Sequence, residues 1–288
     1  MEKVKCYMPQ TLAEALQIRK ETGAIPLAGG SDLMVANSRG AGITPAFEKD
    51  VLIITNLPEL QGIRQNADGS VSVGAGTTSA EIAVSPLIHP LVRDAASRMG
   101  AIALRNTATI GGNIGNASPK GDMPQPLILL DAEVVLKSAD GERRMKVDDY
   151  ILATKKTALR DDELITEVII PKTDFTHIFY RKVGMRRANA ISKLTLSAAA
   201  KIENGVVVDF RASSGAAGPK VARSRQAEEI LVGKKVSELA ACREQFLDAW
   251  NDVISPHAMP EYRRNTTRRR LSYFIDALAA GHPAGRVE

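Results

Sequence analysis

The sequence predicts an α+β fold divided into two domains, and three observations support this. The chain has 288 residues, which is enough to bury a substantial core and more than one domain commonly spans. Residues 1–56 combine short apolar runs with one helical pattern, whereas residues 57–173 are rich in hairpin patterns. Residues 177–214 show the pattern of antiparallel strands, and helical patterns follow them.

The division between the domains is predicted at a hinge over residues 172–175, directly after Pro171. We therefore expect a first domain at 1–173, with lobes at about 1–56 and 57–173. A smaller α+β domain at 174–288 would follow, built from an antiparallel sheet and helices.

The first lobe begins with a strand at 3–8. Thr11 and Glu14 have the spacing of a capping box, and Gly23 ends the apolar periodicity that follows, so a helix over 12–22 is expected. The remaining expected elements are a strand at 24–28, a short helix at 32–38 and a buried strand at 51–55.

The second lobe is expected to open with a hairpin around Asp68-Gly69, a favoured turn dipeptide. Thr77 or Thr78 can cap a helix together with Glu81, and His89 is expected in a solvated loop. The later elements are a helix at 91–99, a helical turn at 126–130, and strands at 132–138, 142–147 and 164–170.

In the second domain Asn204-Gly205 is a strong hairpin signal between two strands. The expected strands are 177–183, 194–203 and 206–214, and the expected helices are 224–232, 237–254 and 261–280. Residues 281–288 are expected to be a frayed tail.

Composition excludes several classes of protein. No apolar run reaches the length of a membrane span, and the N-terminus lacks the apolar region of a signal peptide, so a cytoplasmic location is expected. Two cysteines, Cys6 and Cys242, cannot hold an iron–sulfur cluster that needs four thiolates. The net charge of +5 is concentrated in two arginine-rich stretches, which we expect to be solvated or paired with an acidic neighbouring subunit rather than bound to nucleic acid.

Two glycine-rich stretches are the candidates for a ligand site. Residues 107–122 contain Gly111, Gly112 and Gly115, and residues 26–34 contain Gly29 and Gly30. Glycine opposes helix formation, so the longer stretch is expected not to form a regular helix. Bare backbone amides in such turns bind phosphate, and two such turns could hold a dinucleotide. The spacing fits neither a Walker loop nor the dinucleotide fingerprint of a Rossmann domain.

AGGSDL at 28–33 and TIGGNI at 109–114 resemble the two FAD-binding loops of the flavoprotein (medium) subunits of molybdenum hydroxylases. This family includes enzymes of the xanthine dehydrogenase, carbon monoxide dehydrogenase and nicotinate dehydrogenase types. The resemblance covers the whole chain, including VGAGTT at 73–78 and SPHAMPEYRR at 255–264. It implies a two-lobed FAD-binding domain of the vanillyl-alcohol oxidase (PCMH) type, followed by a C-terminal domain of the CO dehydrogenase flavoprotein type.

The resemblance also implies roles for individual residues. Residues 28–33 would wrap the pyrophosphate, Asp122 would bind the ribityl and adenosine portion, and Lys193 would lie near the flavin ring, which Tyr180 could flank. The expected cofactor-binding residues are Ile25, Leu27, Ala28, Gly29, Gly30, Ser31, Asp32, Leu33, Thr109, Gly112, Asn113, Asp122 and Lys193. The sequence shows no catalytic acid–base pair, no nucleophile constellation and no metal-ligand spacing among its four histidines.

The resemblance therefore implies an electron-transfer subunit that carries FAD. Electrons would come from [2Fe–2S] clusters on a small partner subunit, fed by a molybdopterin-binding large subunit, and would pass to NAD or another acceptor. One alternative is a self-contained flavin oxidoreductase of the same fold acting on a small molecule. Another is a nucleotide-binding interaction module that uses its basic C-terminal helix on a polyanion.

Overall fold

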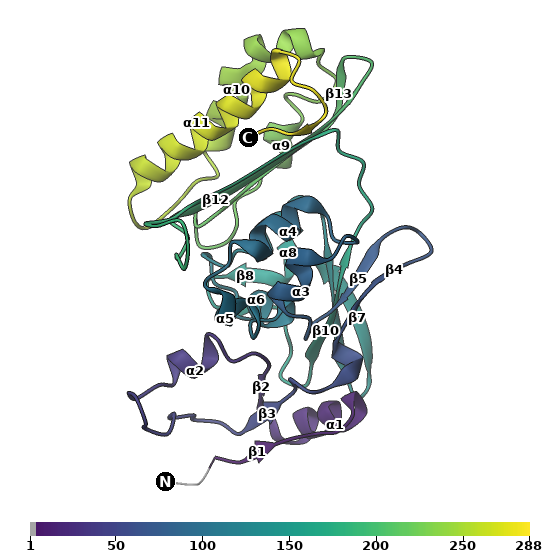
Figure 1. Ribbon diagram of the computed structural model, residues 1–288, viewed down its shortest axis with the longest axis vertical. Coiled ribbons are helices and arrows are strands. Elements are labelled where there is room, and N and C mark those ends of the chain that lie inside the picture. Colours follow the sequence, from purple (N-terminus) through teal and green to yellow (C-terminus); the bar gives the residue numbers. More distant parts are fainter. Residues whose placement is uncertain (1–3) are drawn as a thin grey trace.

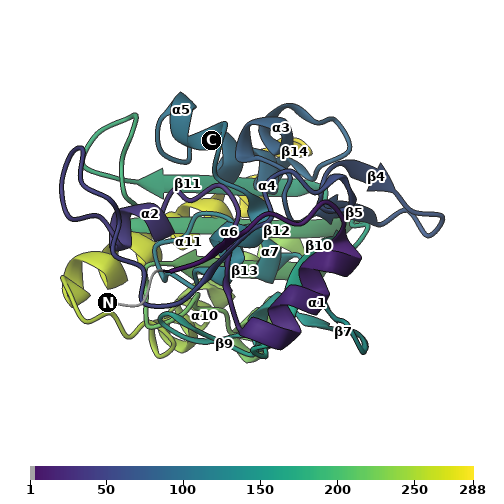
Figure 2. The same cartoon turned by 90° about the horizontal axis from the view of Figure 1, so that it is seen from below.

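Three parts of the molecule follow one another along its longest axis, in the order of the chain. The computed structural model describes residues 4–288. Figure 1 shows a small N-terminal lobe at one end, a middle lobe rich in strands and short helices, and a C-terminal domain with long helices at the other end. Seen from below, the N-terminal lobe lies in front of the other two parts (Figure 2).

The N-terminal lobe is a parallel sheet in the order β1-β3-β2, with one helix beside it. Thr11 accepts a hydrogen bond from the Glu14 amide, and Gly23 ends the helix at φ +64°, as the sequence predicts. Glu14 itself accepts from the Gln10 amide rather than from Thr11. The elements are β1 (Cys6–Tyr7), α1 (Leu12–Thr22), β2 (Ile25–Leu27), α2 (Leu33–Ala36) and β3 (Val51–Ile53). Lys3, at the start of the predicted first strand, lies outside the described residues.

The middle lobe is built on a five-stranded sheet in the order β4-β5-β10-β6-β7. Its hairpins turn at Asp68-Gly69 and at Asp140-Gly141, as predicted. The strands are β4 (Ile63–Gln65), β5 (Val71–Gly74), β6 (Glu133–Ser138), β7 (Gly141–Lys146) and β10 (Leu164–Ile170), with a separate pair β8 (Ile151–Ala153) and β9 (Lys156–Thr157). The helices are η1 (Pro58–Leu60), α3 (Ser79–Val84), α4 (Pro90–Ser97), α5 (Ile102–Arg105), α6 (Ile110–Gly115), α7 (Pro124–Leu129) and α8 (Val147–Tyr150).

The C-terminal domain places its two long helices together on one side of a four-stranded sheet in the order β13-β12-β11-β14 (Figure 1). Phe210, Phe246, Trp250 and Phe274 are fully buried between sheet and helices. The elements are β11 (His177–Val183), β12 (Leu194–Glu203), β13 (Val206–Gly215), α9 (Arg225–Glu228), η2 (Val236–Glu238), α10 (Leu239–Asn251), α11 (Pro260–Ala279) and β14 (Gly285–Arg286). The hairpin at Asn204-Gly205 is confirmed, with positive φ at both residues.

Three expectations about local structure are wrong. The tail is not frayed: β14 pairs in parallel with β11, and Val287 is only 1% exposed. The glycine-rich stretch contains the helix α6, because Thr109 caps it and Gly111 allows its first turn to approach Ala75 closely. His89 is not a solvated loop residue but the N-cap of α4, where its Nδ1 accepts from the Leu91 amide.

The two domains are joined by ion pairs across their junction. Asp131, after α7, accepts from Arg211, Arg223 and Arg225 of the C-terminal domain. Asp122 forms a buried ion pair with Lys182 of β11, with 2.6 Å between the carboxylate oxygen and Nζ. These contacts fix the orientation of the C-terminal domain relative to the middle lobe.

Candidate functional site

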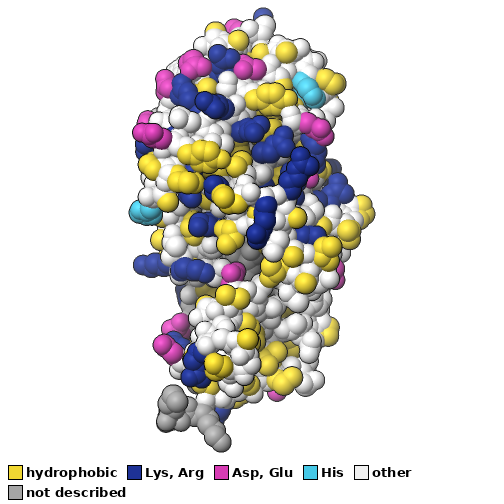
Figure 3. Space-filling view, turned by 60° about the vertical axis from the view of Figure 1, so that its left-hand side comes forward, with side chains coloured by type: hydrophobic (Ala, Val, Ile, Leu, Met, Phe, Trp, Pro, Cys, Tyr) yellow, Lys and Arg dark blue, Asp and Glu magenta, His cyan; other side chains and the backbone are white. Residues whose placement is uncertain are grey.

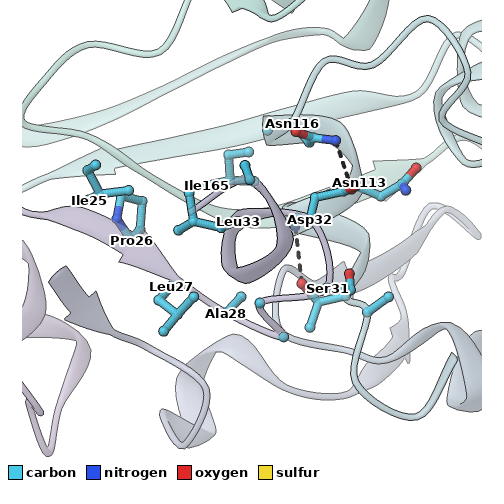
Figure 4. A pocket seen from close by; sticks show the side chains of 18 of the residues that line it. Ile25, Pro26, Leu27, Ala28, Ser31, Asp32, Leu33, Asn113, Asn116 and Ile165 are labelled. Carbon is cyan, nitrogen blue, oxygen red and sulfur yellow. Dashed lines mark hydrogen bonds between the residues drawn. The ribbon is translucent and has the colours of Figure 1, made fainter. Parts of the chain in front are cut away.

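A cavity of about 710 Å³ lies between the N-terminal lobe and the middle lobe (Figure 4). Its walls come from β2, the loop that leads into α2, the helix α6, the β8–β9 turn and the start of β10. Eleven of the thirteen predicted residues line it: Ile25, Leu27, Ala28, Gly29, Gly30, Ser31, Asp32, Leu33, Thr109, Gly112 and Asn113. The structure therefore brings both glycine-rich stretches to one site.

The first glycine-rich loop presents a row of free backbone donors. Within residues 4–288, the amides of residues 29–33 form no hydrogen bond, although the carbonyls of Gly30 and Asp32 accept from the following turn. Gly30 lies at φ +69°, a left-handed conformation in which other residues are strained. Consecutive free amides at a cavity wall are the usual backbone site for a phosphate group.

Gly29 has a structural role beyond the one that the sequence suggested. A Cβ atom at this position would lie 1.6 Å from the carbonyl oxygen of Thr107. Gly29 is therefore needed for contact between the two loops, in addition to lining the cavity. This contact holds the first loop against the stretch that leads into α6.

The second loop contributes less backbone than expected. The first amides of α6 are already bonded: Ile110 donates to Thr77, Gly111 to Ala75, and Gly112 to the Thr109 hydroxyl oxygen. The expectation of bare amides in this stretch is thus wrong at these positions, because helix capping and packing use them. This loop contributes three of the predicted residues to the cavity wall: Gly112, which has no side chain to fill the space, and the side chains of Thr109 and Asn113.

The rest of the cavity is largely apolar. Leu164 and Ile165 line it from β10, Leu159 lines it from the segment after β9, and Ile25 and Leu27 line it from β2. Pro26 is tolerated in β2 because this strand is at the edge of its sheet, where a backbone donor is not required. Apolar walls with a few convergent polar groups are typical of cofactor sites.

Asp122 and Lys193 do not line this cavity. Both oxygens of Asp122 accept hydrogen bonds, from Lys182 at 2.6 Å and from Ser192 at 2.6 Å. The contact with the ribityl portion that the resemblance implies for Asp122 stays a prediction. Burial raises the pKa of Asp122, against the opposing effect of Lys182. Lys193 lies 5.9 Å from the ring centroid of Tyr262.

Tyr180 also lies outside the cavity, packed beneath Arg98 at the domain junction. Its hydroxyl has no hydrogen-bond partner among residues 4–288. Burial raises the pKa of this hydroxyl, and the nearby charge of Asp122 acts in the same direction. The structure therefore supports a core role more directly than contact with a ligand in the main cavity.

Two polar residues of the site were missed by sequence reasoning. Asn116, after α6, donates to the Asp32 carboxylate at 2.8 Å, and Lys155, in the β8–β9 turn, donates to the Asn116 amide oxygen. Figure 4 shows the contact between Asn116 and Asp32. Asn116 stood within the glycine-rich stretch, but no sequence signal distinguishes Lys155 from its neighbour Lys156.

The arginines of the C-terminal helix are largely engaged within the chain itself. Arg268 pairs with Glu244 and Asp248 of α10, and Arg263 donates to the carbonyl of Ala216. Lys and Arg side chains gather on the upper part of the face shown in Figure 3, over the C-terminal domain, where Asp and Glu side chains also lie. The expectation of solvated or intersubunit arginines is thus corrected for these two residues. Among residues 4–288, no helix is both long and apolar enough to cross a membrane.

Comparisons with known proteins agree with this arrangement. A family model described as "FAD binding domain in molybdopterin dehydrogenase" matches residues 2–173, and one described as "CO dehydrogenase flavoprotein C-terminal domain" matches residues 179–278. The chain is 36% identical over 247 residues to the nicotinate dehydrogenase FAD-subunit of Eubacterium barkeri, covering 81% of each protein. It is 31% identical over 233 residues to the glyceraldehyde dehydrogenase medium chain of Sulfolobus acidocaldarius, covering 80% of this chain and 81% of that one.

The fold is that of a solved structure, carbon monoxide dehydrogenase from Hydrogenophaga pseudoflava, with a TM-score of 0.85 at 24% identity. The match covers 96% of this chain and 98% of the other, which confirms the predicted α+β fold class. The chain therefore belongs to the family of FAD-binding flavoprotein subunits of molybdopterin dehydrogenases, with a C-terminal domain of the CO dehydrogenase flavoprotein type.

Proposed function

We propose that this chain binds FAD in the cavity between its lobes and serves as the electron-transfer subunit of a molybdenum hydroxylase complex. Electrons would arrive from [2Fe–2S] clusters on a small partner subunit, and a large partner would hold the molybdenum cofactor. From the flavin, the electrons would pass to NAD or another acceptor. The observation that carries the proposal is the row of free amides at residues 29–33 in a cavity with an otherwise apolar lining.

The cavity suits a flavin dinucleotide in three respects. Its volume of about 710 Å³ lies within the usual range for cofactor sites. The free amides of residues 29–33 would bind the diphosphate, and the Thr109 hydroxyl, which uses only an acceptor lone pair in capping α6, retains its proton for donation. Ile25, Leu27 and Leu164 provide the apolar surface on which a ring can pack.

The residues of the cavity favour electron transfer over self-contained catalysis. Bound FAD supplies the redox chemistry, since a flavin can accept electrons singly or in pairs. Only Asp32 and Lys155 among the lining residues carry ionisable side chains, and they are bridged to each other by Asn116. A dehydrogenase acting directly on a small molecule commonly needs a free acid or base beside its substrate, which this cavity lining does not provide.

The test compares the intact complex with the isolated chain. The complex is purified from its native host without dissociating the partners, and iron, molybdenum and flavin are quantified. Adding the oxidisable substrate of the complex should bleach the flavin absorbance of the complex but not that of the isolated chain. Substrate turnover by the isolated chain would favour the self-contained oxidoreductase, and a chain without flavin would reject the proposal.

A second test introduces the variant Gly112→Val into the same complex, and the wild-type complex is its control. Among residues 4–288, a Cβ atom at residue 112 would closely approach only the Thr109 hydroxyl, at 3.0 Å, so a small shift of that side chain should accommodate it while the branched side chain occupies the cavity. We expect loss of flavin and of electron delivery to the acceptor, with iron and molybdenum content retained. Full flavin content in this variant would contradict the placement of the cofactor.

A further inference from the structure

Among residues 4–288, Lys155 is the only lysine or arginine that lines the cavity. It comes from the turn between β8 and β9, far in sequence from both glycine-rich loops. Its neighbour Lys156 has the same charge and begins β9, but it does not line the cavity. The chain therefore offers two adjacent lysines, of which one is at the site and the other is not.

The backbone of Lys155 is held in an unfavourable conformation. Its φ is +59°, in the left-handed region that glycine adopts without strain and lysine does not. Its amide donates to the carbonyl of Ala117, at the end of α6, with 2.9 Å between nitrogen and oxygen. This hydrogen bond holds the β8–β9 turn next to the segment that contains Asn116.

The side chain of Lys155 is oriented by a chain of contacts that ends in the first loop. Its Nζ donates to Oδ1 of Asn116, and Nδ2 of Asn116 donates to Oδ2 of Asp32 at 2.8 Å. Asp32 lies within the row of free amides. The ammonium group is therefore two hydrogen bonds away from the backbone that is best suited to bind phosphate.

Charge balance explains why a lysine is useful here. The free amides supply partial positive charge, but the Asp32 carboxylate in the same loop would repel a diphosphate. Asn116 occupies one carboxylate oxygen, and the ammonium group of Lys155 opposes the negative charge. A diphosphate against residues 29–33 would then have both amide donors and one full cation within its surroundings.

We propose that Lys155 is a binding residue for the diphosphate of the dinucleotide, and that Asn116 and Asp32 are positioning residues that orient it. This inference rests on the proposed function, because it assigns a further contact within the same FAD site. The ligand class is a nucleoside diphosphate moiety, recognised by its charge.

The glycine-like conformation of Lys155 provides an informative variant. Lys155→Gly removes the ammonium group and at the same time relieves the backbone strain. If Lys155 were only structural, this variant would bind the cofactor as well as the wild type or better. If Lys155 binds the diphosphate, the variant should lose affinity for the cofactor while its thermal stability is retained or increased.

The experiment uses the full-length chain stripped of flavin and titrated with FAD, monitored by quenching of flavin fluorescence. We expect Lys155→Gln and Lys155→Gly to raise the Kd for FAD about tenfold or more at low salt, the effect of losing one charge-assisted hydrogen bond. Lys156→Gln should leave the Kd unchanged. Lys155→Gly should melt at the same temperature as the wild type or higher.

Salt provides the second measurement. Raising the NaCl concentration should weaken FAD binding more in the wild type than in Lys155→Gln, because the variant lacks the charge that salt screens. Equal Kd values for Lys155→Gln and the wild type, or equal salt dependence of the two, would overturn the role of Lys155 while leaving the FAD site intact. A wild-type chain that binds no FAD would overturn the proposed function together with this inference.

Discussion

At the scale of single residues, the glycines around the cavity serve different purposes although they look alike in the sequence. Gly30 provides a left-handed turn, and Gly112 leaves space in the cavity. Gly29 instead allows one backbone segment to touch another, because only a residue without Cβ fits against the Thr107 carbonyl. Substitutions at these positions should therefore have different effects.

We predict that Gly29→Ala destabilises the fold as well as the site. The added Cβ would lie 1.6 Å from a backbone oxygen, so the loop must move away from residue 107. Overpacking of this kind costs about 3 kcal/mol. Urea denaturation should show the loss of stability, and flavin content should fall. Gly141→Ala is the control, since nothing lies within 4 Å of a Cβ there, and an unchanged Gly29→Ala variant would refute the loop contact.

His89 shows how a residue can be placed correctly in the sequence and still be misinterpreted. It precedes a helix, as expected, but it caps that helix and lies against the edge of Phe175. Burial, together with the nearby charge of Arg93, lowers its pKa from 6.5 to about 4. The folded protein therefore keeps His89 neutral at pH values where the unfolded chain protonates it.

The pH dependence follows from this depressed pKa. Between pH 6.5 and about 4 the unfolded state binds the proton and the folded state does not, so this stabilisation, complete above pH 6.5, is lost as the pH falls. The loss reaches about 3 kcal/mol near pH 4. His89→Asn retains a capping side chain without the titration. Urea denaturation at pH 7.5 and pH 4.5 should show a smaller drop for the variant, and equal drops would contradict the prediction.

At the scale of elements, local sequence signals were sufficient to predict hairpins, because two adjacent residues determine the conformation of each turn. Asn204-Gly205 and Asp68-Gly69 predicted two hairpins that the structure contains. The signals failed where a distant segment decides the conformation. The helix α6 forms against Ala75, and the strand β14 forms against β11, more than a hundred residues earlier in the chain.

We predict that the C-terminal strand contributes measurably to stability. Val287 is 1% exposed, and its amide donates to Ile178 on β11. Val287→Ala should cost about 2 kcal/mol through lost burial and the remaining cavity. Val208→Ala, at a valine 39% exposed on β13, is the control and should change the free energy of unfolding by about 0.5 kcal/mol or less. A Val287→Ala variant as stable as its control would indicate that β14 is only loosely attached.

At the scale of the whole molecule, the sequence predicted that the two glycine-rich loops would meet. It did not predict the ion pairs and hydrogen bonds that hold the domains together. Eleven of thirteen predicted residues line one cavity, because the loop after β2 in the N-terminal lobe and the segment after α5 in the middle lobe converge there. Asp122 does not line this cavity, and its partners Lys182 and Ser192 come from the other domain. Long-range ion pairs of this kind leave no periodic pattern in the sequence.

The junction around Asp131 is one of these long-range networks. Its carboxylate accepts from Arg211 at 3.0 Å, Arg223 at 3.0 Å and Arg225 at 2.6 Å. Burial alone would raise the pKa of Asp131, but the hydrogen bond from Arg225 and the neighbouring guanidinium charges lower it overall. Arg223 is 4% exposed and also pairs with Glu228, so removing Asp131 leaves a buried cation with one partner fewer.

We predict that Asp131→Asn loosens the domain junction without disturbing the local backbone. Asp131 lies at φ +56°, a conformation that asparagine also tolerates, so the change removes the charge alone. We expect a loss of about 2 kcal/mol and faster proteolysis near residues 171–175, because a buried ion pair broken on one side leaves its partner uncompensated. Asp140→Asn removes the exposed partner of Lys20 and should cost less than about 1 kcal/mol. If both variants unfold at the same denaturant concentration and are cleaved at the same rate, the Asp131 network does not hold the two domains together, and their orientation must depend on the apolar contacts of the junction and on the Asp122–Lys182 pair.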